Sequence, residues 1–221
     1  MIVDERIITF INSLDTKNSE ILEDIEREAL ADNVPIIRRE MQSFLKVLLM
    51  VKKPMRVLEV GTAVGFSALL MSEYVPEECA ITTIENYEKR IPIARQNFVR
   101  AGKEKKITLL EGDAMDVRKT LEGPYDFIFM GAAKGQYIHY LPEILRLLAK
   151  GGILVSDNVM QDGDVIESRF AVERRDRTIH ARMREYLYEL KHNDALVTSI
   201  IPLGDGVALS VKKEVGTDIA Q

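Results

Sequence analysis

The first quarter of the chain places apolar side chains three and four positions apart, which is the spacing of one face of a helix. The two apolar stripes are Ile7, Ile8, Ile11 and Leu14, and then Phe44, Leu45, Leu48 and Leu49. This pattern predicts a helical segment over residues 1–53. We expect it to form a cap that belongs to the same domain as the rest of the chain.

From Met55 onward, short apolar runs alternate with longer helical stretches. The runs predict strands at 56–60, 80–84, 107–110, 125–130 and 152–156. The stretches between them predict helices at 66–74, 87–101, 114–120 and 137–149. Because strands that alternate with crossover helices pair in parallel, this pattern predicts a doubly wound α/β sheet.

The last part of the chain breaks this alternation. A helix is predicted at about 168–190, and two further strands at 195–201 and 206–211 flank a turn-forming Pro-Leu-Gly-Asp-Gly segment. We therefore predict a Rossmann-like, mostly parallel seven-stranded sheet that closes with a C-terminal antiparallel hairpin. The core should cover residues 54–215, and 216–221 should be a short tail.

Composition narrows the class of protein. With 221 residues, 46% of them hydrophobic and 29% charged, the chain can bury one substantial core. It shows neither a secretory leader pattern nor a membrane-length apolar run, so we expect a cytoplasmic protein without a membrane. Cys79 is the only cysteine, which excludes an intrachain disulfide, and we expect it half-buried where a strand opens. The net charge of −5 argues against a protein that generally coats nucleic acid.

A glycine loop follows the first predicted strand and opens a helix. Gly61 and Gly65 let the backbone turn tightly and approach a ligand without a Cβ in the way. The loop lacks the Gly-Lys-Ser/Thr of a phosphate-binding P-loop, and its Gly-x-x-x-Gly spacing differs from the dinucleotide fingerprint. The pattern favours S-adenosylmethionine (SAM) as the cofactor, bound around residues 59–65.

Acidic residues stand at three successive strand ends. Glu59 ends the first strand, and Glu85 ends the second, where a carboxylate can accept hydrogen bonds from both ribose hydroxyls. Asp113, between Gly112 and Ala114, can border an adenine, although by itself it is equally typical of a helix cap or a surface acid. The three acids together predict a SAM site.

Five segments carry a resemblance to a known family: Arg-Arg-Glu-Met-Gln-Ser-Phe-Leu at 38–45, Leu-Glu-Val-Gly-Thr-Ala-Val-Gly-Phe-Ser at 58–67, Ala-Ala-Lys-Gly-Gln-Tyr at 132–137, Val-Ser-Asp-Asn-Val at 155–159 and Pro-Leu-Gly-Asp-Gly-Val-Ala-Leu at 202–209. Over nearly its whole length the chain resembles the catechol-O-methyltransferase-like, cation-dependent O-methyltransferases. It is most similar to the bacterial branch that methylates 5-hydroxyuridine at the tRNA wobble position. The resemblance implies a cofactor site of Met41, Glu59, Gly61, Thr62, Gly65, Ser67, Glu85, Gly112, Asp113, Ala114 and Gly131.

The resemblance also implies a Mg²⁺ site, and one ligand of it is missing. In the family, an aspartate after the fourth strand joins an Asp-Asn pair after the fifth, and a lysine follows the first aspartate by three residues. Here Asp157 and Asn158 are the pair and Lys134 is the lysine, which makes Lys134 and Asp157 the candidate catalytic residues. Gly131 stands where the first aspartate is expected.

The missing carboxylate leaves four possibilities open. Asp162 or Asp164 replaces it, water completes the metal's coordination, Lys134 works without a metal, or the chain is an inactive variant. Hard oxygen ligands suit Mg²⁺, so losing one should lower affinity for this ion.

The acceptor is predicted from basic and aromatic residues. Arg38 begins a helix of the cap, and Arg174 and Arg175 head a basic stretch that continues through Arg177, Arg182 and Arg184. This stretch fits contacts with RNA phosphates or, with its interspersed acids, a solvated helix face. Tyr137, with Tyr140 and Phe170, is a candidate to line the acceptor pocket, although aromatic residues at helical spacing more often belong to a core.

Three functional hypotheses follow. With the resemblance, the leading one is a tRNA 5-hydroxyuridine O-methyltransferase. The alternatives are a small-molecule catechol or phenol O-methyltransferase, and a catalytically impaired protein that binds SAM or RNA. The resemblance also implies a homodimer, with which the apolar N-terminal stripes are compatible.

Overall fold

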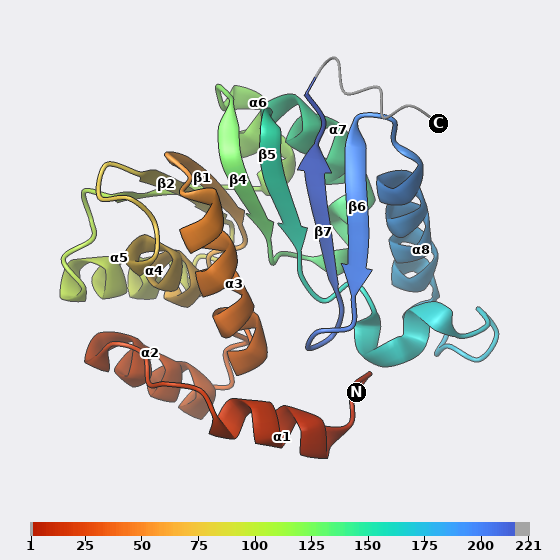
Figure 1. Ribbon diagram of the computed structural model, residues 1–221, viewed down its shortest axis with the longest axis horizontal. Coiled ribbons are helices and arrows are strands. Elements are labelled where there is room, and N and C mark those ends of the chain that lie inside the picture. The colour runs from red at the N-terminus through yellow and green to blue at the C-terminus, as the bar shows by residue number, and fades with distance from the viewer. Residues whose placement is uncertain (1, 215–221) are drawn as a thin grey trace.

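The computed structural model describes residues 2–214, and within that range seven strands form one mixed sheet (Figure 1). The strand order is β3-β2-β1-β4-β5-β7-β6. The strands are β1 Arg56–Val60, β2 Ala80–Glu85, β3 Ile107–Glu111, β4 Tyr125–Met130, β5 Leu148–Ser156, β6 Leu196–Ile201 and β7 Val207–Lys212. The first five pair in parallel, and β7 pairs antiparallel with both β5 and β6. The predicted Rossmann-like sheet with its closing hairpin is confirmed.

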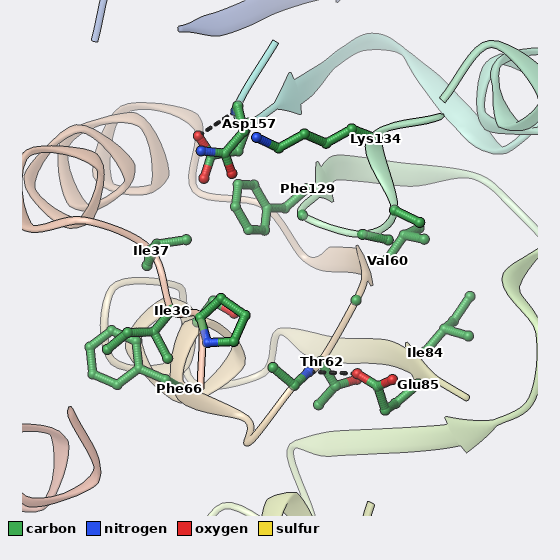
Figure 2. A pocket seen from close by; sticks show the side chains of 18 of the residues that line it. Ile36, Ile37, Val60, Thr62, Phe66, Ile84, Glu85, Phe129, Lys134 and Asp157 are labelled. Atoms are coloured by element: carbon green, nitrogen blue, oxygen red, sulfur yellow. Dashed lines mark hydrogen bonds between the residues drawn. The ribbon is translucent and has the colours of Figure 1, made fainter. Parts of the chain in front are cut away.

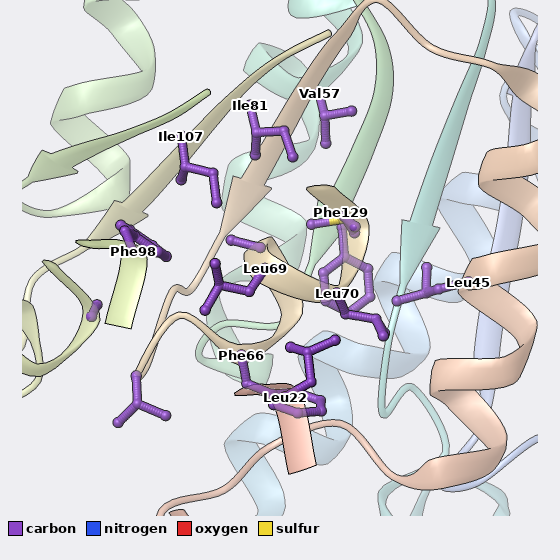
Figure 3. Close-up of a cluster of buried hydrophobic side chains, with 14 of the residues drawn as sticks. Leu22, Leu45, Val57, Phe66, Leu69, Leu70, Ile81, Phe98, Ile107 and Phe129 are labelled. Atoms are coloured by element: carbon purple, nitrogen blue, oxygen red, sulfur yellow. The ribbon is translucent and has the colours of Figure 1, made fainter. Parts of the chain in front are cut away.

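Helices cover both faces of the sheet. One face carries α2 Glu20–Ala31, α3 Arg39–Lys52, α4 Phe66–Glu73 and α5 Ile91–Arg100, and the other carries α6 Ala114–Thr120, α7 Tyr137–Leu147 and α8 Arg177–His192. Successive strand residues point to opposite faces, so Val57 belongs to the first core and Leu58 to the second. Figure 3 shows the first core, where Phe66 and Leu69 of α4 pack beneath the strands.

The two N-terminal apolar stripes have different surroundings. Leu45 and Leu49 on α3 are fully buried in the first core, as their spacing predicts. In contrast, α1 Glu5–Ser13 has no buried residue, and Ile7, Ile11 and Leu14 are 52%, 47% and 69% exposed. The α1 stripe therefore makes an apolar surface on this chain instead of contributing to its core.

Several predicted boundaries were wrong, most of all for the helix expected at 168–190. That helix, α8, begins at Arg177, because a stripe that the fold can bury starts only with His180, Met183, Tyr186 and Leu190. Before it, Phe170 is 84% exposed and offers no packing that would hold a helix. The helices expected at 87–101 and 137–149 are shorter, since α5 begins at Ile91 and α7 ends at Leu147.

Three smaller expectations concern single features. Cys79 is fully buried just before β2, where a half-buried position was expected. The tail predicted at 216–221 lies outside the described residues. No helix within residues 2–214 combines the length and apolar character needed to cross a membrane.

Candidate functional site

A cavity of about 610 Å³ opens at the carboxyl ends of the parallel strands. Open α/β sheets bind their ligands at this edge, where loops from several strands converge. Figure 2 shows Glu85 and Thr62 at one end of the cavity and Lys134 and Asp157 at the other. Its size lies within the range of pockets that hold cofactors and small ligands. The predicted residues that line it are Arg38, Met41, Gly61, Thr62, Ser67, Glu85, Gly112, Ala114, Gly131, Lys134, Asp157 and Asn158.

The two glycines of the loop after β1 have different tasks. Both have a positive φ, +103° at Gly61 and +85° at Gly65, which favours glycine. Gly61 lines the cavity, and a Cβ there would lie 2.9 Å from the backbone nitrogen of Ala132. Gly65 does not line it, because it faces α5, where a Cβ would lie 2.5 Å from the Phe98 ring. Gly65 therefore packs against α5, and its predicted contact with the cofactor stays a prediction.

Glu59 lies beneath the cavity and is fully buried. Its carboxylate accepts hydrogen bonds from the hydroxyls of Ser67 and, at 2.5 Å, Thr83. Burial raises the pKa of Glu59 to about 7. Glu59 therefore orients Ser67, which lines the cavity. Glu59, a predicted cofactor-binding residue, does not line the cavity itself.

Glu85 joins the end of β2 to the loop after β1. Its Oε2 accepts a hydrogen bond from the Ala63 amide at 2.7 Å, and its Oε1 accepts from the amides of Asn86 and Tyr87 at 3.0 and 2.9 Å. These contacts fix the carboxylate at the cavity wall, where it keeps lone pairs for a ligand. Asn86 and Tyr87 also line the cavity, and sequence reasoning missed them because their residue types carry no specific signal there.

Asp113 follows β3 but does not reach the cavity, although its neighbours Gly112 and Ala114 do. Its Oδ1 accepts a hydrogen bond from the Met115 amide at 2.7 Å, at the start of α6. This is the geometry of a helix cap, the alternative that the sequence allowed for Asp113, and its predicted position beside an adenine stays a prediction.

Asp205 is a buried acid at the other end of the cavity, to which sequence reasoning assigned no role. It lies in the turn between β6 and β7, is 2% exposed, and pairs with Lys134 at 3.0 Å between Oδ2 and Nζ. Its Oδ1 accepts a hydrogen bond from the Asp162 amide. Two signals could have marked it: an acid between two glycines in a hairpin turn, and its place in the segment 202–209 that carries the family resemblance.

Asp157 and Asn158 follow β5 and line the same end of the cavity. Asp157 is buried, and its Oδ1 accepts a hydrogen bond from the Asn158 amide at 2.7 Å. Burial raises the pKa of Asp157 to about 6, against the opposing effects of the Asn158 amide and the nearby Lys134 charge. In Figure 2 the Lys134 side chain extends toward Asp157.

The comparison with known proteins agrees with this arrangement. A family model described as O-methyltransferase matches residues 12–213. The chain belongs to the O-methyltransferase family. Catechol O-methyltransferase of Niastella koreensis is 34% identical over 128 residues, which are 56% of this chain and 58% of that enzyme, so the match spans little more than half of that relative.

Two further relatives cover more of the chain. Caffeoyl-CoA O-methyltransferase 2 of Populus trichocarpa is 32% identical over 183 residues, which are 75% of this chain and 70% of that enzyme. The crystal structure of a methyltransferase from Podospora anserina with bound S-adenosylhomocysteine (SAH) superposes with a TM-score of 0.85 at 26% identity, covering 95% of each chain. Family and fold thus agree.

The residues present in this O-methyltransferase do not fit the Mg²⁺ site that the resemblance implies. Asp157 and Asn158 supply oxygen donors, but Gly131 has no side chain to offer. Across residues 2–214, no group of three or more His, Cys, Asp or Glu side chains is arranged to hold a metal. Asp162 lies at the cavity, with its carboxylate 3.8 Å from Arg38, whereas Asp164 does not line it. Asp205 also lines this end of the cavity, but its carboxylate pairs with Lys134 and accepts from the Asp162 amide. Asp157 and Asn158 beside a lysine ammonium make a poor Mg²⁺ site.

The predicted acceptor residues are only partly brought together. Tyr137 does not line the cavity: its ring is fully buried, and its hydroxyl donates to the carbonyl oxygens of Met130 at 2.9 Å and Asp157 at 3.2 Å. Tyr137 therefore cannot stack on an acceptor. Of the three candidate aromatic residues, Tyr140, one helical turn later, lines the cavity. Phe170 is exposed and also lies outside the cavity.

Three of the five arginines in the basic stretch make hydrogen bonds within the fold. Arg177, Arg182 and Arg184 donate to the backbone carbonyls of Val172, Gly135 and Val165 at 3.2, 3.1 and 2.9 Å. Arg174 and Arg175 are exposed and do not line the cavity, and their predicted contact with the acceptor stays a prediction. Arg175 also pairs with Glu173 and Asp176 at 3.0 and 3.4 Å.

Proposed function

We propose that this chain transfers the methyl group of SAM to a hydroxyl of a small aromatic acceptor of the catechol or phenol class. The observation that carries the proposal is a single cavity with a ribose-type carboxylate, Glu85, at one end and the Lys134–Asp157 pair at the other. The names of the relatives from Niastella and Populus point to acceptors of the same chemical class.

The cofactor would lie along the carboxyl ends of β1 to β4. Glu85 would accept hydrogen bonds from the ribose hydroxyls, and Gly112 and Ala114 would border the adenine. The loop at Gly61 and Thr62 would hold the amino-acid part of SAM beneath Met41 of the cap. In this placement the sulfonium methyl would face the end of the cavity that Lys134 and Asp157 line.

The reaction is an in-line displacement. The acceptor oxygen bonds to the methyl carbon while the carbon–sulfur bond breaks, and the electron pair of that bond goes to sulfur, which leaves SAH. The acceptor proton passes to the Asp157 carboxylate, and the Lys134 ammonium stabilises the negative charge on the acceptor oxygen. Because the rate depends on holding the oxygen in line with the methyl group, the walls of the cavity would contribute by positioning the acceptor.

A tRNA 5-hydroxyuridine acceptor is the second candidate. The observation in its favour is that Arg174 and Arg175 stay exposed, while Arg38 lines the cavity. These three cations fit an acceptor with phosphates outside the cavity. Against it stand the net charge of −5 and the three arginines of the same stretch that bond to backbone carbonyls.

Methyl transfer from radiolabelled SAM distinguishes the candidates. We expect catechol or caffeoyl acceptors to be labelled, with unchanged rates in an Arg174→Ala/Arg175→Ala variant. Labelling of hydroxyuridine-containing tRNA alone, lost in that variant and at high salt, would establish the second candidate instead. SAH binding without labelling of any acceptor would support the third hypothesis, a protein that binds the cofactor but does not catalyse.

A further inference from the structure

An ion pair occupies the end of the cavity where the family resemblance places a metal. The Lys134 ammonium is 3.0 Å from Oδ2 of Asp205, whose side chain is almost completely buried. Removal of Lys134 would leave the buried Asp205 carboxylate without its counterion, which is strongly unfavourable, whereas the Lys134 side chain itself is 36% exposed. The positive charge of Lys134 is therefore held at a defined position beside Asp157.

The turn that carries Asp205 is fastened to the segment after β5. The Met160 amide donates to the Asp205 carbonyl, and the Val159 amide donates to the Gly206 carbonyl, both at 2.9 Å. Gly206 has a φ of +82°, and a Cβ there would overlap the side chain of Met160. Because backbone contacts fix this turn, the Asp205 carboxylate is positioned before any ligand arrives.

The backbone at position 131 does not require glycine. A Cβ on Gly131 would lie 3.3 Å from the Phe129 ring edge and would meet no backbone atom, and the residue is not in the left-handed region. An aspartate could be built there with a small adjustment of Phe129. Position 131 therefore accepts a Cβ with a small shift of Phe129, and a positive charge at this end of the cavity comes from Lys134, which is paired with Asp205.

We propose that methyl transfer by this chain requires no divalent cation, because the Lys134 ammonium, positioned by Asp205, supplies the positive charge at the acceptor oxygen. This inference rests on the proposed function and uses the same bond changes: the oxygen–carbon bond forms, the carbon–sulfur bond breaks toward sulfur, and the acceptor proton goes to Asp157. Lys134 then contacts the reacting oxygen, and Asp205 is a positioning residue that acts through Lys134.

The first experiment measures metal binding without any acceptor. The SAH-loaded protein is titrated with Mn²⁺ and followed by electron paramagnetic resonance. We expect no site-bound Mn²⁺ in the wild type up to about 1 mM, and binding at least about tenfold tighter in Gly131→Asp, which restores a carboxylate ligand. Micromolar binding of Mn²⁺ by the wild type would overturn the proposal.

The second experiment measures turnover of an aromatic acceptor with EDTA and with added Mg²⁺ or Mn²⁺. We expect equal wild-type rates under all three conditions. Loss of activity in EDTA that Mn²⁺ restores would overturn the proposal. If the wild type methylates no acceptor although it binds SAH, the proposed function fails, and the Mn²⁺ titration still decides whether the site takes a metal.

The third experiment tests Asp205 as a positioning residue. Asp205→Asn should lower kcat about 10- to 100-fold, since displacement of the Lys134 charge by about an ångström has effects of that size. The KM for SAM and the SAH affinity should stay unchanged, and Asp205→Glu should restore part of kcat. Asp164→Asn is the matched control, because Asp164 is two residues from Asp162, whose amide donates to Asp205, but does not line the cavity. A lower melting temperature for Asp205→Asn with unchanged kcat would reduce Asp205 to a structural role and overturn its part of the proposal.

Discussion

Gly65 marks the start of α4, and a single added methyl group there tests how tightly the loop beside the cavity is packed. In Gly65→Ala the new Cβ would sit 2.5 Å from Cε1 and 3.0 Å from Cζ of Phe98, with φ at +85°. The left-handed conformation costs alanine about 1–2 kcal/mol. Forcing the methyl group against the ring adds about 1–3 kcal/mol.

Gly102 provides a matched control. Its φ is also positive, +63°, but a Cβ there would meet nothing within 4 Å. Gly102→Ala should therefore carry the conformational cost alone, about 1–2 kcal/mol. The difference between the two variants isolates the clash with Phe98 and should be about 1–3 kcal/mol.

Urea unfolding followed by circular dichroism measures both free energies, with equal m-values for the variants. Adding Phe98→Leu to Gly65→Ala should recover part of the loss, since it removes the ring atoms in the way. We also expect weaker SAH binding for Gly65→Ala only, because this loop continues to Gly61 and Thr62 at the cavity wall. Equal destabilisation by Gly65→Ala and Gly102→Ala would refute the reasoning.

Three further predictions concern the cavity, the acid beneath it and the N-terminal surface. Glu85→Gln should weaken SAH binding in calorimetry about 10- to 100-fold through loss of charge-assisted hydrogen bonds, whereas Glu111→Gln, at the exposed end of β3, should not change it. Because the pKa of Glu59 is raised from 4.5 to about 7, the wild type should lose stability as pH rises through this window. Glu59→Gln should therefore gain on the order of 3 kcal/mol relative to the wild type between pH 4.5 and pH 8, and a difference independent of pH would contradict this. The homodimer remains a prediction: Phe10→Glu/Leu14→Glu on the exposed α1 stripe should convert dimers to monomers in light scattering, and a monomeric wild type would rule it out.

The sheet and the edge at which ligands bind were predictable from local patterns. Short apolar runs between amphipathic stretches give strands and crossover helices, and parallel strands place all their carboxyl ends at one edge. Gly61, Glu85, Asp157 and Lys134 lie at those ends or within four residues after them, so their convergence could be inferred before any coordinates were known.

The directions and partners of individual side chains could not be inferred in this way. Glu59 and Gly65 belong to the predicted loop, but the packing of Thr83 and Phe98, from other elements, turns them away from the cavity. Asp205 meets Lys134 across 71 residues of sequence, because β7 pairs with β5 and brings its preceding turn to the ligand-binding edge. Chain order specifies which elements alternate, whereas contacts of this kind depend on strand pairing and on close packing between elements that are distant in sequence.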